Sequence, residues 1–180
     1  MKFEISPNFQ HGKRKVIYSN QEHSFDMDIS WYTDFTLMLG CAYIGLNVAL
    51  SSLEVVNVSG FCPSENWIKK PLCIPVETCR GTIKIVSNSD ICEGTGTYLF
   101  DEAVMYFDEN SRWCYIDGMT QLLAECNVRF CENVMFSLCG NVLVGVWIHL
   151  GDKYSSTDYT LIEKIDIPDK HSYHWEDIKN

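Results

Sequence analysis

The sequence of 180 residues lacks the short motifs that assign a chemistry directly. No two cysteines have the two-residue spacing of zinc ribbons and redox motifs. The segment EGTGTY lacks both the third glycine of a dinucleotide fingerprint and the lysine of a phosphate loop, and no serine, cysteine or lysine lies in a recognisable nucleophile motif. The sequence therefore predicts no cofactor and no metal, and favours a protein that is not an enzyme.

Basic residues are also few. The chain has 14 lysines and arginines and 24 aspartates and glutamates, which gives a net charge of -10. An acidic surface repels phosphate backbones, which argues against nucleic-acid binding, and it suits a basic protein partner. Hydrophobic residues make up 46% of the chain and charged residues 21%. Those fractions indicate a folded globular protein rather than a disordered one.

Cysteine is abundant, with nine residues. The first residues, MKFE, lead into charged sequence without the apolar segment of a secretory signal. We therefore expect reduced, mostly buried cysteines in a cytoplasmic protein. A disulfide framework and a structural metal are the alternatives.

One uncharged stretch, residues 35–53, approaches the length of a membrane-spanning helix. Asn47, two glycines and two serines dilute its apolar content, and no basic cluster flanks it. We expect two buried strands with a bend near Gly40 instead of a membrane span.

Turn signals recur about every ten residues and helical periodicity is scarce, which predicts a mainly β fold. The expected architecture is an antiparallel β-sandwich or barrel-like sheet with one or two short helices, forming a single domain over residues 1–168 with a polar tail at 169–180. The segment GTYLFDEAVMYFDEN is compatible with a strand or a short helix, and MTQLLAEC, residues 119–126, predicts a helix. Strands are expected at residues 2–6, 15–19, 24–30, 45–50, 53–61, 81–86, 112–118 and 159–168.

The segment RFCENVMFSLCGNVLVGVWIHL predicts a hairpin that turns at its Gly-Asn pair, residues 140–141. If the two strands pair without interruption from that turn, Phe136 lies opposite Gly145 and its ring covers the glycine. The same register places Glu132 beside His149 at the open end of the hairpin.

The expected Glu132–His149 pair has two interpretations. A carboxylate and an imidazole across a hairpin can form an ordinary cross-strand polar pair, contributing at most about 1 kcal/mol. The alternative is that the carboxylate orients the imidazole as a general base at the mouth of a cavity. The first interpretation is favoured because no nucleophile can be assigned to the pair.

Several acidic and aromatic residues are candidates for binding a partner. In FDMD, two aspartates alternate with apolar residues and share one strand face. The tryptophan of CPSENWIKKPL either packs under its long connection as an anchor or is exposed for recognition at an interface. In the tail, HSYHWED could bind a transition metal, although accidental clustering is favoured. The partner-binding candidates are Asp26, Asp28, Trp67, Asp108 and Glu109.

The segments VVNVSGFCPSENWI, CEGTGTYLF, YFDENSRWCYIDG and VRFCENVMFSLCGNVLVGVWIHL resemble small bacterial β-rich proteins associated with immunity genes of polymorphic or contact-dependent toxin systems. The resemblance covers about two-thirds of the chain, and its short motifs are mostly structural. It implies a β fold and a role in immunity but no catalytic mechanism. The matching positions are Gly60, Pro63, Trp67, Tyr106, Phe107, Asp108, Trp113, Ile116, Gly118, Phe130, Glu132, Asn133, Leu143 and Trp147.

Three functional hypotheses follow from the sequence. The first is a cytoplasmic acidic immunity protein that neutralises a toxin by direct binding, drawn to a basic partner by its charge. The second is a small enzyme or ligand-binding barrel that uses Glu132 and His149. The third is a structural β protein with no partner that can be inferred.

Overall fold

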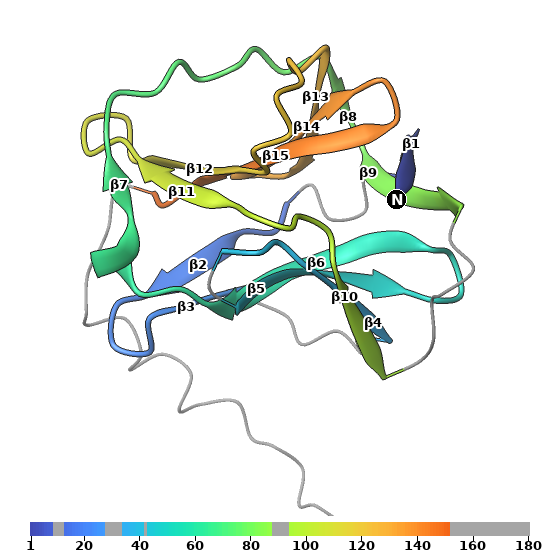
Figure 1. Ribbon diagram of the computed structural model, residues 1–180, viewed down its shortest axis with the longest axis horizontal. Coiled ribbons are helices and arrows are strands. Elements are labelled where there is room, and N and C mark those ends of the chain that lie inside the picture. The colour runs from blue at the N-terminus through green and yellow to red at the C-terminus, as the bar shows by residue number, and fades with distance from the viewer. Residues whose placement is uncertain (9–12, 28–33, 42, 88–93, 152–180) are drawn as a thin grey trace, which may run out of the picture.

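The computed structural model describes residues 1–8, 13–27, 34–41, 43–87 and 94–151. Two β-sheets are stacked face to face (Figure 1), which confirms the predicted mainly β, sandwich-like fold. The first sheet contains β1 (Lys2–Ser6), β2 (Val16–Ser19), β3 (Ser24–Met27), β4 (Phe35–Met38), β5 (Tyr43–Ala49), β6 (Glu54–Phe61), β9 (Thr82–Ser87) and β10 (Thr95–Tyr98). The second contains β7 (Ile68–Lys69), β8 (Cys79–Arg80), β11 (Val104–Phe107), β12 (Trp113–Asp117), β13 (Cys126–Cys131), β14 (Val134–Cys139) and β15 (Val142–His149).

The strand order places the long strands in the centre of each sheet and short strands at the edges. The second sheet runs β7-β11-β12-β15-β14-β13-β8, and the first runs β1-β9-β6-β5-β4-β10, with the β2–β3 hairpin attached to β6. Most neighbouring strands are antiparallel. The edge strands β7, β8 and β10 instead pair in parallel with β11, β13 and β4.

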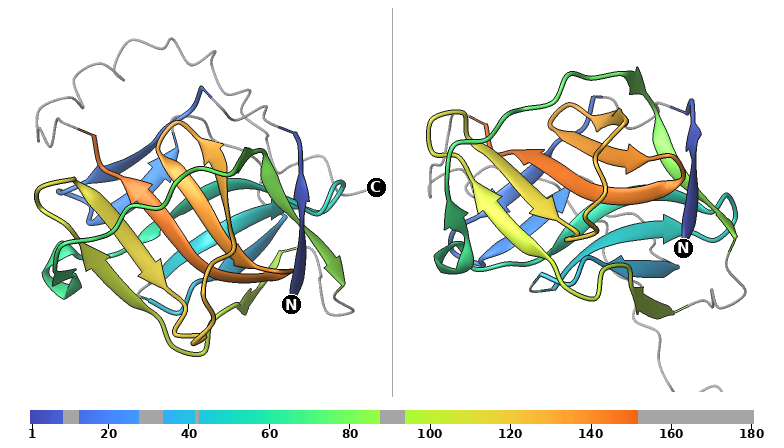
Figure 2. Two further views of the ribbon diagram at one scale, coloured as in Figure 1. Left: turned by 90° about the horizontal axis from the view of Figure 1, so that it is seen from above. Right: turned by 45° about the horizontal axis from the view of Figure 1, so that its top comes forward.

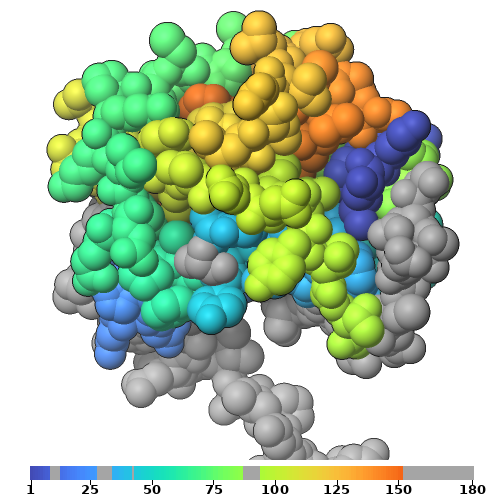
Figure 3. Space-filling view, in the orientation of Figure 1, coloured from blue at the N-terminus to red at the C-terminus, as the bar shows by residue number. Residues whose placement is uncertain are grey.

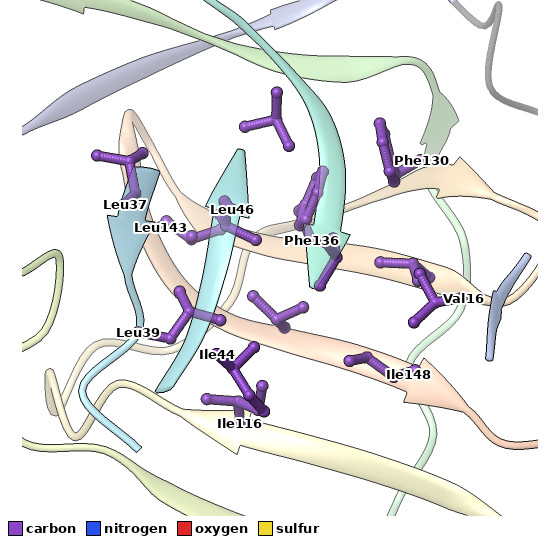
Figure 4. Close-up of a cluster of buried hydrophobic side chains, with 14 of the residues drawn as sticks. Val16, Leu37, Leu39, Ile44, Leu46, Ile116, Phe130, Phe136, Leu143 and Ile148 are labelled. Carbon is purple, nitrogen blue, oxygen red and sulfur yellow. The ribbon is translucent and has the colours of Figure 1, made fainter. Parts of the chain in front are cut away.

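Alternating apolar residues of the two inner faces fill the space between the sheets, as the two-residue period of a strand requires. Leu37, Ile44 and Leu46 of the first sheet are fully buried with Ile116 and Phe136 of the second. Figure 4 shows these side chains pointing toward one another between the layers.

The uncharged stretch at residues 35–53 forms the antiparallel strands β4 and β5, which confirms the expected pair of buried strands. Gly40, with φ of 77°, lies in the bend between them. Its missing side chain also leaves room for the backbone of Phe100. In the described part of the chain, no helix has the length and apolar content needed to cross a membrane.

The predicted helix at residues 119–126 is wrong. The chain there is an irregular connection, and Met119 and Gln121 have φ values of 50° and 59°, which a right-handed helix does not contain. The only helical turn among the described residues is η1 (Ser64–Asn66). The expected strand at 159–168 and the polar tail lie outside the described residues.

Candidate binding surface

The β14–β15 hairpin turns at residues 140–141 as predicted, since Cys139 pairs with Val142. Beyond the next pair, Leu138 with Leu143, the register shifts because Val144 is an extra residue on β15. Such a bulge places two residues of one strand opposite one of its partner.

The bulge makes the predicted pairing of Phe136 with Gly145 wrong. Phe136 pairs with Val146 and points into the core, whereas Ser137 pairs with Gly145 on the outer face. The space left by Gly145 is covered by the ring of Tyr115 from β12. A glycine is therefore covered by an aromatic ring, but the ring comes from a different strand.

The predicted pairing of Glu132 with His149 is wrong for the same reason. Glu132 lies in the tight turn between β13 and β14, and its carboxylate is 3.0 Å from the ammonium group of Lys15. The backbone of His149 instead pairs with Asn133, and its ring lies 5.2 Å from the ring of Trp113. No hydrogen bond or ion pair joins the two side chains, both of which the structure describes. The pair on which the enzyme hypothesis depends is therefore not formed.

Trp67 is 7% exposed, so it is an anchor under its connection and not an exposed recognition residue. Its ring lies 4.8 Å from Tyr18, 5.9 Å from Phe25 and 5.5 Å from Phe107, centroid to centroid. Its indole N–H donates to Cys62 Sγ at 3.2 Å. Two open pockets flank this tryptophan, and neither is lined by Glu132 or His149.

The predicted acidic candidates have different environments. Asp108 is 6% exposed, and its carboxylate accepts hydrogen bonds from the backbone N–H groups of Leu72 and Asn110 at 3.1 and 2.9 Å. These hydrogen bonds, led by that from Leu72, hold the pKa of Asp108 below its usual value. Such a carboxylate organises its turn and is not available at a surface.

Of the other acidic candidates, Glu109 is exposed and paired with Lys69, whose ammonium nitrogen is 2.7 Å from the carboxylate. Asp26 is exposed on β3. Asp28 lies outside the described residues.

The connection between β7 and β8, residues 70–78, lies across the outer face of the second sheet. These two strands form opposite edges of the sheet, about six strand spacings or roughly 29 Å apart. Ten residue steps separate Lys69 from Cys79, and a fully extended chain of that length reaches about 33–36 Å. The connection, called the strap below, is therefore nearly extended, as Figures 1 and 2 show in green.

Hydrogen bonds fix the strap at both ends. At its start, Lys70 N donates to Phe107 O at 3.0 Å. At its end, Thr78 N donates to Asn127 O at 2.9 Å, and the side-chain amide of Asn127 donates to Val76 O at 3.3 Å. Ile74 and Val76 of the strap are 42% and 82% exposed.

An aromatic row lies on the outer face that the strap crosses. Tyr115 stacks on Trp147 at 4.2 Å between centroids, and the Trp147 ring lies 6.4 Å from Trp113. The indole N–H of Trp147 donates to Ser137 Oγ at 3.0 Å, and Ser137 donates to Asn127 Oδ1 at 2.6 Å. The row is thus connected through hydrogen bonds to the end of the strap.

A second exposed surface is formed by the β10–β11 connection, residues 99–103, and the β12–β13 connection, residues 118–125. They lie side by side because the ring of Phe100 packs on Gly118 and Val104 pairs with Asp117. Figure 3 shows both on one face, in yellow-green and gold. We call its exposed and half-exposed side chains the acidic loop edge: Asp101, Glu102, Asp117, Met119, Leu122 and Leu123.

The acidic loop edge combines unpaired charge with exposed apolar side chains. Residues 94–128 contain six acidic residues and only one basic residue, Arg112. Asp101, Glu102 and Asp117 form no ion pair with any cation of the described chain. Leu123 is 86% exposed, with Leu122 at 46% and Met119 at 49%.

This surface was not predicted from the sequence. Its leucines belong to the segment predicted as a helix, where a leucine pair indicates a buried face. The detectable signal is the long excess of acidic over basic residues between Lys84 and Arg129, together with consecutive leucines next to a turn.

Similarity to known proteins adds no assignment. No protein-family model matches the chain, and no curated protein matches it. The resemblance to immunity-type proteins stays a prediction. Among the described residues, no group of three or more histidine, cysteine, aspartate or glutamate side chains is arranged to hold a metal ion.

Proposed function

We propose that this protein is an inhibitor that binds a basic protein and neutralises it, as immunity proteins do with their cognate toxins. The observation that carries the proposal is the acidic loop edge, where Asp101 and Glu102 have no ion-pair partner among the described residues, and where the connection packed against theirs carries the exposed Leu122 and Leu123. Unpaired carboxylates favour a cationic partner, and exposed leucines on the neighbouring connection mark a contact surface.

The two kinds of side chain contribute to binding in different ways. Long-range attraction between the carboxylates and a basic surface raises the association rate, and salt reduces this effect over a Debye length of about 8 Å at physiological ionic strength. The leucines provide apolar area that leaves water on contact, and this slows dissociation. An edge with both features suits a partner with arginines or lysines around an apolar patch.

The experiment is co-expression with the protein encoded beside its gene. If that neighbour is a toxin, the wild-type chain restores growth of cells that express it. The double variants Asp101→Lys/Glu102→Lys and Leu122→Ser/Leu123→Ser lose most of this protection, while their unfolding midpoints stay within a few degrees of wild type because the replaced side chains are exposed.

The matched control is Asp26→Lys/Glu109→Lys, which makes the same change of net charge on other parts of the surface. We expect this variant to protect almost as well as wild type. If only the control variant loses protection, the binding surface lies outside the acidic loop edge. Failure of the wild-type chain to protect, although the neighbour is toxic and the chain is folded, would overturn the proposed function.

A further inference from the structure

Two half-buried thiols meet where the strap and the β12–β13 connection end. Cys79 opens β8 directly after the strap, and Cys126 opens β13 directly after the other connection. Their Sγ atoms are 3.9 Å apart, although 47 positions separate them in sequence. The two strands are neighbours in the sheet, and Cys126 lies two positions before Val128, the residue opposite Cys79.

Thr78 fixes the position of one of these thiols. Its hydroxyl oxygen is 2.9 Å from Cys126 Sγ, accepts a hydrogen bond from Asn127 N at 2.8 Å and donates to Asn127 O at 2.9 Å. Both cysteines pack against the margin of the hydrophobic core and are partly exposed. A small oxidant can therefore reach them, in contrast to the fully buried Cys114 and Cys131.

We propose that Cys79 and Cys126 form a redox modification site that takes a low-molecular-weight disulfide, such as oxidised glutathione, as its substrate. The thiolate of one cysteine attacks a sulfur of the glutathione disulfide, forms a mixed disulfide and releases one glutathione thiolate, which is then protonated. The second cysteine loses its proton, attacks the protein sulfur of that mixed disulfide and releases the second glutathione. Two protein thiols are oxidised to one disulfide, and one glutathione disulfide is reduced to two glutathione thiols.

Forming this bond requires the strands to move. A disulfide has an S–S length of about 2.05 Å, so the sulfurs must approach by roughly 1.9 Å. Because Val128 and not Cys126 lies opposite Cys79, side-chain rotation must be accompanied by a movement of the short edge strand β8 relative to β13. The bond would tie the end of the strap to the end of the connection that carries Leu122 and Leu123. Bond formation is independent of the proposed function, whereas its effect on partner binding depends on that function.

The protonation of Cys79 affects how fast the bond forms. Burial, and next the neighbouring Cys126, raise the pKa of the Cys79 thiol. Because the thiolate is the reacting species, exchange is slow at neutral pH and becomes faster as the pH rises.

The test exposes the full-length, reduced protein to oxidised glutathione under native conditions, followed by alkylation, proteolysis and peptide mass spectrometry. We expect a disulfide-linked peptide pair joining Cys79 to Cys126, while the exposed Cys73 carries only glutathione. The thermal midpoint should rise by several degrees, on the order of 5–10 °C, because the crosslink restricts the unfolded chain. Reduction with dithiothreitol should reverse both changes.

The variants Cys79→Ser and Cys126→Ser should lose the linked peptide and the rise in midpoint, and the control Cys73→Ser should keep both. If glutathione modifies Cys73 while Cys79 and Cys126 stay unlinked at pH 8 to 9, the proposal is overturned. Peptide mapping of the wild-type protein gives this result even if a variant fails to fold. Once a binding partner is identified, its affinity can be compared for the reduced and the oxidised protein. If the disulfide forms but the affinity does not change, only the proposed effect of the disulfide on binding is rejected.

Discussion

At the scale of single residues, Asn133 joins the two sheets with its side-chain amide. Val16 N donates to Asn133 Oδ1 at 2.9 Å, and Asn133 Nδ2 donates to Val16 O at 2.7 Å and to His149 O at 2.6 Å. The amide thus bonds to Val16 as a paired strand residue would. Asn133 is 8% exposed, so water cannot easily replace these bonds.

Replacing Asn133 by alanine leaves the two backbone groups of Val16 without their amide partner. We expect the free energy of unfolding to fall by about 3 kcal/mol, because each buried polar group that loses its partner costs about 1–3 kcal/mol. Urea denaturation measures the change. The matched control is Asn110→Ala, where the side chain is exposed and the expected loss is below about 0.5 kcal/mol. Equal losses in the two variants would refute the role of the amide.

The β14–β15 hairpin shows which local features could be predicted from the sequence and which could not. The Gly-Asn turn was predictable from local backbone preference. The bulge at Val144 has one local signal, the glycine that follows it inside a strand, but its position depends on how Tyr115 packs on Gly145 from another strand. One extra residue on β15 moves every later side chain of that strand to the other face relative to β14. Glu132 and His149 are therefore no longer paired.

At the scale of elements, Asp108 joins the turn after β11 to the beginning of the strap. It accepts the N–H of Leu72 in the strap and those of Asn110 and Ser111 in its own turn, the last at 3.4 Å. All three donors favour the charged form of the carboxyl, which explains its lowered pKa.

This lowered pKa predicts a pH dependence of stability. A carboxyl whose pKa is lower in the folded than in the unfolded state stabilises the fold above its unfolded pKa of about 4, and this contribution disappears as the pH falls through the folded pKa. Asp108→Asn should therefore be less stable than wild type at pH 7, and the difference should shrink as the pH falls below about 4. Denaturation midpoints from pH 7 to pH 3 measure it, and a constant difference would contradict the assignment.

The β12–β13 connection allows a direct test of its irregular backbone. Gln121 has φ of 59°, where a glycine is unstrained and other residues cost about 1 kcal/mol. We expect Gln121→Gly to keep or raise the free energy of unfolding by up to about 1 kcal/mol. In the helix that the sequence suggests, the same change would destabilise by about 1 kcal/mol. Ala124→Gly, in the same connection but without a positive φ, is the control and should destabilise slightly.

Strands were more predictable than the connections between them. β3 shows the alternation most clearly, since Phe25 and Met27 are buried and Asp26 between them is exposed. The strap was not predicted as a crossing segment, because its path depends on β7 and β8 joining opposite edges of one sheet. The pairing of β7 with β11 and of β8 with β13 joins segments that are far apart in the chain, so it leaves no local signal in the sequence.

At the scale of the whole molecule, the negative charge is unevenly distributed. The described residues include fourteen acidic and ten basic side chains, so their net charge is -4 against -10 for the chain. Most of the described basic residues lie before residue 85, whereas residues 94–128 contain six acidic and one basic residue. The acidic loop edge therefore lies in the described segment with the largest excess of acidic over basic residues, which is where the proposed binding of a basic partner is expected.

The most direct test of the binding account is the kinetics of association with the neutralised partner, measured at several salt concentrations. For Asp101→Lys/Glu102→Lys, the account predicts association at least about tenfold slower at low salt, a difference that shrinks as salt rises, and little change in dissociation. Leu122→Ser/Leu123→Ser should instead mainly speed dissociation, by about tenfold or more. Unchanged kinetics in both variants, with slower association in Asp26→Lys/Glu109→Lys, would contradict the account and place the binding surface elsewhere.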